Sequence, residues 1–99
     1  MTREEILAEL EKVEHPEIAA SLVELGMIQD IAVEGDTVRV AMALPTLGIP
    51  EIVRNMLVQS VQQVLESLNY RMEVEFFEMT EVAKQRFFVI AQARWKGSI

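Results

Sequence analysis

The chain has 99 residues, which predicts a single domain over residues 1–99 because this length leaves no room for two independent cores. Apolar residues make up 51% and charged residues 25%, proportions typical of a soluble globular protein and too apolar for a disordered one. There is no cysteine and only one histidine. Disulfides, metal centres held by thiolates, cysteine nucleophiles and multi-histidine metal sites are therefore excluded.

The net charge of −7 disfavours general binding to nucleic acid, because an acidic surface repels phosphate groups. The charges are unevenly distributed. Residues 1–81 contain all 16 acidic residues, whereas residues 82–99 contain four basic residues and no acidic one. We interpret residues 80–99 as a basic C-terminal helix whose cations complement its own C-terminal dipole or the acidic body. The alternative is a docking element for an acidic partner.

The N-terminal residues are charged and no apolar run follows them, which predicts that the chain carries no signal peptide. No segment approaches the ~20 apolar residues that span a bilayer, so we expect no contact with a membrane. The absence of cysteine fits a reducing compartment. These observations predict a cytoplasmic protein.

The first elements are predicted to be two helices. Thr2 can cap the first, and Glu5 completes a capping box before apolar residues at three- and four-residue spacing. Pro16 interrupts this pattern and can open a new helical turn. A short second helix then carries apolar contacts and ends at Gly26 in a left-handed conformation. Its apolar residues are Ile18, Leu22 and Leu25.

Two strands follow, over about 27–34 and 37–44, and Gly35 with Asp36 forms the tight turn between them. The second strand alternates clearly, with an apolar face that we expect to enter the core. Small residues line the end of its opposite face, which leaves room for close packing there. The apolar face consists of Val38, Val40, Met42 and Leu44, and the small residues are Ala41 and Ala43.

A loop with two prolines and a glycine precedes a helix over about 50–68, with Pro50 in its first position and Asn69 closing it. Its predicted buried stripe is broad. A third strand covers about 70–78, and the broken alternation at Phe76 and Phe77 predicts a strand end or bulge there. Thr80 can cap a last helix over about 81–94. The predicted buried stripe of the helix over about 50–68 consists of Ile52, Val53, Met56, Leu57, Val61, Val64, Leu65 and Leu68.

The predicted order is therefore α-α-β-β-α-β-α. A hairpin cannot bury its apolar face alone, so the long helix must cross over and cover the sheet, with a right-handed connection to the third strand. We predict an α+β fold, a two-layer sandwich in which helices pack on a small mixed three-stranded sheet.

Three segments together resemble the iron–sulfur cluster assembly domain, which PaaD-like and SufT-like proteins share with the N-terminal module of Mrp-type ATPases. They are residues 15–17 (HPE), 21–31 (SLVELGMIQDI) and 38–50 (VRVAMALPTLGIP), and the similarity covers roughly residues 5–78. The resemblance implies a small α+β protein that acts in the maturation of iron–sulfur proteins as a scaffold, carrier or adaptor.

The chain departs from that family at two positions. The family usually has Asp where this chain has His15, and it usually places a cysteine at the position of Ile49. A thiol just before a helix N-terminus has a lowered pKa, so it can offer a thiolate to iron. Isoleucine neither ionises nor binds metal. We therefore expect no cofactor and no metal site, and partner binding as the function that survives.

The resemblance places the functional spot in the loop before the long helix. An aliphatic residue cannot cap that helix, and Pro50 has no N–H to donate. We expect Thr46 to turn back as a cap, or the first turn to be solvated; the alternative is a contact with a partner's carboxylate. The predicted partner-binding residues of this loop are Thr46, Leu47, Gly48, Ile49, Pro50 and Glu51.

The C-terminal helix carries apolar residues around much of its circumference. One stripe can pack on the sheet, and the remaining apolar residues then face outward. The stripe consists of Phe87, Ile90, Ala91 and Arg94, and the outward residues are Phe88, Val89 and Trp95. Aromatic residues interleaved with cations are typical of an interface, so Phe88 and Trp95 are further predicted partner-binding residues. Burial of both stripes against the second face of the sheet, and a homodimer through this helix, are the alternatives.

Other candidates have simpler explanations. His15 lacks partners for a metal site, and we interpret it as a loop histidine. Carboxylates such as Glu73 and Glu75 alternate along one strand, as on a solvated sheet face. The methionines are expected to fill gaps in the core, with Met79 as the one that could be exposed.

The sequence thus predicts a non-enzymatic adaptor or accessory protein whose partners are iron–sulfur assembly or client proteins, with no catalytic residue and no cluster held by the chain alone. One alternative is a metal or cluster carrier that uses His15 or carboxylates. Another is a self-associating structural domain of unrelated function.

Overall fold

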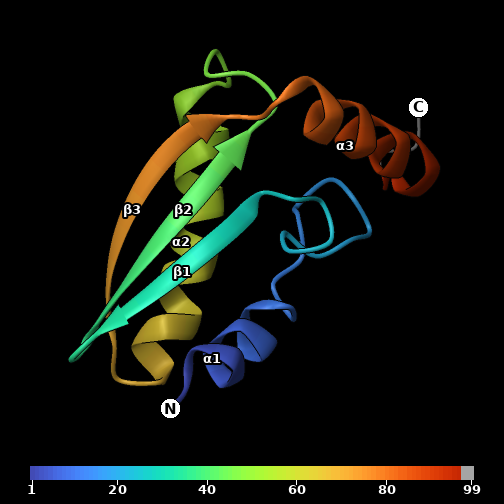
Figure 1. Cartoon of the computed structure of the whole chain (residues 1–99). Helices are drawn as coiled ribbons and strands as arrows, with labels where there is room; N and C mark the ends of the chain where they lie inside the picture. The colour runs from blue at the N-terminus through green and yellow to red at the C-terminus, as the bar shows by residue number, and fades with distance from the viewer. Residues whose placement is uncertain (97–99) are drawn as a thin grey trace.

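A three-stranded sheet in the order β1-β2-β3 organises the chain, and it is mixed, as predicted (Figure 1). The computed structural model describes residues 1–96. β2 pairs antiparallel with β1 and parallel with β3, and α2 makes the crossover between the two parallel strands. The α+β class is therefore confirmed. The elements are α1 (Arg3–Leu10), β1 (Ile28–Glu34), β2 (Thr37–Leu44), α2 (Glu51–Ser67), β3 (Arg71–Glu78) and α3 (Glu81–Arg94).

The described residues form three helices, so the prediction of a short second helix before β1 is wrong. Between α1 and β1 the chain makes a single helical turn, in which Ser21 and Glu24 cap one another through side chain to backbone bonds of 3.0 and 3.2 Å. The preceding residues pair with distant backbone instead, as in the bond from the Ala19 N–H to the Arg94 carbonyl (2.7 Å). These tertiary bonds outweigh the local helical pattern. Gly26 is left-handed, with φ of 76°, as predicted.

β2 is the buried centre of the sheet. Its apolar face lies in the core as predicted, and Ala43 on the opposite face is also buried. The predicted strand end or bulge at Phe76 and Phe77 is wrong, because β3 stays in register with β2 as far as the pair of Leu44 and Glu78. The irregularity lies instead in β1, between Ile28 and Asp30.

α2 buries a narrower stripe than predicted. Leu57, Val61 and Leu65 are buried, whereas the side of the helix facing away from the sheet carries Ile52, which is 72% exposed, and Met56, which is 45% exposed. The stripe is narrower because a single sheet face covers only part of a helix circumference. Pro50 is the N-cap rather than the first helical residue, and Asn69, at φ of 67°, closes the helix as predicted.

Met79 is buried, at 4% exposure, which corrects the prediction that it could lie at the surface. Its N–H bonds to the Leu44 carbonyl at 2.8 Å and so continues the ladder one residue beyond β3. The helix cap that follows is as predicted: the Thr80 side chain accepts from the Ala83 N–H.

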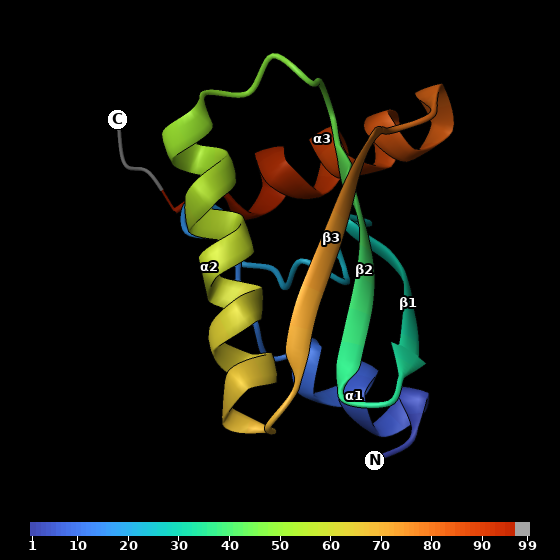
Figure 2. The same cartoon turned by 90° about the vertical axis from the view of Figure 1, so that its left-hand side faces the viewer.

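The helices cover the sheet unevenly. α2 lies over one face, whereas α1 lies beside β1 and contacts both β1 and α2 (Figure 2). α3 extends past one end of the sheet and lies along the loop between α1 and β1 (Figure 1). No helix within residues 1–96 has the length and apolar character needed to cross a membrane. The remaining face of the sheet is left largely open.

The packing of α2 leads to a stability prediction. Leu65→Ala should lower the free energy of unfolding by about 2–5 kcal/mol, because it leaves a cavity in the core. Ile52→Ala is the matched control on the same helix and should change it by about 0.5 kcal/mol or less, since the residue is solvent-exposed. Urea unfolding followed by circular dichroism measures both values. Equal losses for the two variants would contradict the placement of Ile52 on the solvent side.

Candidate functional site

The two predicted contact segments leave the same end of the sheet. Because β2 and β3 are parallel, their C-terminal ends lie side by side at the pair of Leu44 and Glu78. Residues 45–50 connect β2 to α2 and include all of the predicted contact segment of residues 46–51 except Glu51, which begins α2. α3 begins just beyond β3 (Figure 1). The topology therefore places the loop next to the start of α3.

The loop turns on its own side chain rather than capping the helix that follows. Thr46 Oγ1 accepts a hydrogen bond from the Gly48 N–H at 3.2 Å. Of the two expected arrangements, the one in which Thr46 caps α2 is therefore wrong. Pro50 provides no side-chain cap either. Leu47 is exposed, while Ile49 is partly buried and packs against the core. The loop thus directs Leu47 to solvent and holds Ile49 inward.

α3 has a buried side and an exposed apolar side. Phe87 and Ala91 are buried, but Phe88 is 49% exposed and Trp95 is 46% exposed. The alternative in which both stripes are buried is therefore wrong. Phe88 and Trp95 line a shallow apolar hollow together with Ala91 and Gln92, and the Phe88 ring meets Phe87 edge-on at 5.6 Å. The hollow lies on α3 and its C-cap residue, Trp95, and does not include the loop of residues 46–51.

Three cations of the C-terminal segment, Lys84, Arg94 and Lys96, pair with carboxylates, which agrees with the interpretation preferred from the sequence. Lys96 Nζ lies 2.6 Å from a Glu14 carboxylate oxygen, and Arg94 Nη1 lies 3.4 Å from Glu24. Backbone bonds join the same segments, from the Lys96 N–H to the Glu17 carbonyl at 2.9 Å, for example. The end of α3 is therefore fastened to the loop that precedes β1.

His15 lies in the part of this loop that contacts the end of α3, and it is buried. Its Nδ1 accepts a hydrogen bond from the Glu17 N–H at 3.0 Å, which makes a turn of the kind that an Asp or Asn side chain makes with the N–H two residues on. Burial lowers the pKa of His15, and Lys96 lowers it further against the opposing effect of Glu17. No group of three or more His, Asp or Glu residues within residues 1–96 is placed to hold a metal ion.

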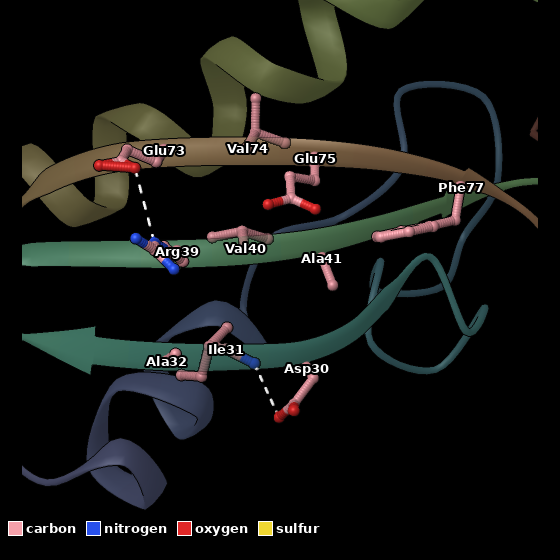
Figure 3. A pocket seen from close by; sticks show the side chains of 10 residues that line it. All are labelled: Asp30, Ile31, Ala32, Arg39, Val40, Ala41, Glu73, Val74, Glu75 and Phe77. Atoms are coloured by element: carbon pink, nitrogen blue, oxygen red, sulfur yellow. Dashed lines mark hydrogen bonds and ion pairs between the residues drawn. The ribbon is translucent and has the colours of Figure 1, made fainter.

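Charged side chains occupy alternate positions of the strands on the open face of the sheet, as predicted for a solvated face. Arg39 lies 3.6 Å from both Glu34 and Glu73. This face also has a concavity, lined among others by Arg39, Glu73, Ala41 and the exposed ring of Phe77, where the small residues of β2 predicted room for close packing (Figure 3).

These features define a small α+β domain in which a helical crossover covers one face of a mixed three-stranded sheet. Residues 3–76 match the family described as iron–sulfur cluster assembly protein, and the chain belongs to that family. It is 33% identical over 86 residues to an iron–sulfur cluster carrier protein of Synechocystis sp., a match that covers 87% of this chain. The chain spans 24% of that relative's length.

The fold is also similar to a crystal structure of a domain of unknown function, DUF59, from Bacillus anthracis. The TM-score is 0.68 and the sequence identity 25%, and the match covers 85% of this chain and 81% of the other.

The burial of His15 predicts a pH-dependent stability. Burial lowers the pKa of the His15 imidazole in the folded state, whereas the unfolded chain takes up a proton near the ordinary pKa of 6.5. The free energy of unfolding should therefore fall as the pH is lowered from about 7.5 to about 5.5. His15→Asn should abolish this loss, because its amide oxygen can accept from the same N–H and does not titrate. Urea midpoints at the two pH values test this, and equal shifts in both proteins would refute it.

Proposed function

We propose that this protein is a non-catalytic adaptor or accessory protein in the maturation of iron–sulfur proteins, one that binds partner proteins and holds no cluster by itself. The observation that carries the proposal is Ile49. The resemblance places a cysteine at this position, directly before α2, and the side chain present here is an inward-packed hydrocarbon.

The other ligand types are no better placed for cluster binding. Iron–sulfur clusters are held by thiolates, in some cases with histidine, and this chain has no cysteine. The side chain of its one histidine is buried, and its Nδ1 is already engaged with the Glu17 N–H. These facts favour the adaptor over a carrier that uses non-thiol ligands, even though the Synechocystis relative is named a carrier.

The proposed contact surfaces are the loop of residues 46–51 and the hollow on α3. Leu47 supports the first because it is an exposed apolar side chain on a loop. Phe88 and Trp95 support the second, since exposed aromatic residues around a hollow are typical anchors of protein interfaces. The partners are iron–sulfur assembly or client proteins. A homodimer that uses the α3 hollow is the competing use of this surface.

The first prediction of this proposal concerns metal. After anaerobic incubation with ferrous iron and sulfide, followed by gel filtration, the protein should retain no stoichiometric iron and show no stable visible absorption band. Ile49→Cys should retain more iron than Ile49→Ser, because only the first supplies a thiolate before the helix. Brown wild-type protein with stoichiometric iron would overturn the proposal.

The second prediction concerns partners. Leu47→Asp and Phe88→Asp should each lower the capture of iron–sulfur proteins from a cell extract roughly tenfold or more, because each places a charge in an apolar contact. Val82→Asp is the matched control: Val82 is exposed on α3 but does not line the hollow.

Quantitative mass spectrometry of the captured proteins gives the readout. Unchanged capture by both test variants would remove the loop and the hollow from the proposal. Light scattering of the wild type and of Trp95→Ala separates the remaining possibility, since a homodimer through the hollow would lose mass in the variant.

A further inference from the structure

The two edges of the sheet differ in their protection. At the outer edge of β1, the Arg3 Nε–H donates to the Ile31 carbonyl at 3.0 Å, and the Ile31 N–H donates to Asp30 Oδ1 at 2.9 Å. Arg3 and Asp30 also pair with one another, and α1 contacts this strand. Side chains therefore occupy the positions that an added strand would need at this edge.

The outer edge of β3 has no such cover. The Arg71 N–H bonds to the Asp36 carbonyl at 2.7 Å, and the Met79 N–H bonds to Leu44, so the odd-numbered residues of β3 face β2. Alternate residues of a strand bond to opposite sides, which turns the N–H and C=O groups of Met72, Val74 and Phe76 outward. No hydrogen bond from residues 1–96 reaches these groups, and no other element crosses in front of β3 in Figure 2.

The side chains along this edge give it two chemically different sides. On the side of α2, the alternate residues Met72, Val74 and Phe76 are partly buried and apolar. On the open face, Glu73 and Glu75 are exposed. Arg39, on the neighbouring strand, pairs with Glu73 at 3.6 Å, and no ion pair within residues 1–96 involves Glu75.

These charges oppose pairing between two copies of the chain along this edge. An antiparallel pair of β3 strands centred on Val74 would place Glu73 of each copy opposite Glu75 of the other, and like charges directly opposite are destabilising. A register centred on Glu73 or on Glu75 would place that glutamate opposite the same glutamate of the other copy. Registers centred on Met72 or on Phe76 avoid this repulsion. The first pairs only the first three residues of β3, which is too short to stabilise a dimer. The second places Glu75 opposite Phe77 and Glu78 opposite Val74, so it gives these carboxylates no opposite charge.

We propose that the outer edge of β3 binds an extended segment of a partner protein as a fourth strand, and that this segment alternates basic and apolar residues. The basic side chains would lie opposite Glu73 and Glu75 on the open face, and the apolar ones beside Met72, Val74 and Phe76. The outward N–H and C=O groups of β3 form the hydrogen bonds to the partner segment. The two glutamates favour a segment with basic side chains over one with acidic side chains. This proposal rests on the strand alone and is independent of the loop and the α3 hollow.

The test uses the full chain and a short synthetic peptide that alternates Lys and Val. NMR-detected amide exchange should show new protection of the Met72, Val74 and Phe76 N–H groups when the peptide is added. Binding should weaken as the ionic strength is raised, because exposed charges are screened by salt. A peptide with Glu in place of Lys should not bind. Absence of binding by the Lys peptide, or binding without protection of these three amides, would overturn the proposal.

Charge reversal on β3 provides the second arm. The double variant Glu73→Lys with Glu75→Lys should bind the Lys peptide roughly tenfold more weakly, as expected when two cross-strand pairs change from attraction to repulsion. The matched control, Glu11→Lys with Glu66→Lys, makes the same change in net charge at exposed positions outside the sheet. An equal loss in the control would mean that net charge rather than the β3 edge binds the peptide, and would refute the proposal.

Discussion

The mixed pairing of β2 is the constraint on which the rest of the structure depends. Its hydrogen bonds run antiparallel on one side and parallel on the other, and its apolar face forms much of the core. A parallel neighbour requires a crossover, so α2 must span the sheet and cover one face. The same pairing brings the ends of β2 and β3 together, which sets the loop of residues 46–51 beside the start of α3. Burial of a single strand thus arranges both proposed contact segments.

The elements that follow a clear local pattern were predictable from the sequence. Thr2 with Glu5, Gly35 and Thr80 mark helix starts or a turn through their own chemistry, and the alternation of β2 identified its buried face. The errors lie where distant parts of the chain decide the outcome. Ile18 pairs with Trp95, so residues 14–20 are not helical, and one sheet face is too narrow to bury Ile52. Periodicity carries no information on either contact.

The candidate surfaces were predictable in composition but not in placement. An excess of apolar residues on α3 indicated exposure of some of them, and the structure identifies Phe88 and Trp95 at the hollow. From the sequence, the Thr46 hydroxyl could accept a hydrogen bond either from an N–H within its own loop or from an N–H in the first turn of α2. The backbone path of the loop determines that it accepts from the Gly48 N–H. His15 could not have been recognised as buried. Its cover comes from the last residues of the described chain, far away in sequence.

The fastening of Trp95 and Lys96 to the loop before β1 has a consequence for synthesis on the ribosome. The Ala19 N–H and the Glu17 carbonyl find their backbone partners only at Arg94 and Lys96, which are made about eighty residues later. Until those residues leave the exit tunnel, the Ala19 N–H and the Glu17 carbonyl can bond only to water, however complete the hairpin has become. Contacts between distant segments also slow the final step, because the intervening chain must be ordered first. The nascent protein therefore passes through a stage with its sheet partly formed and this loop still open.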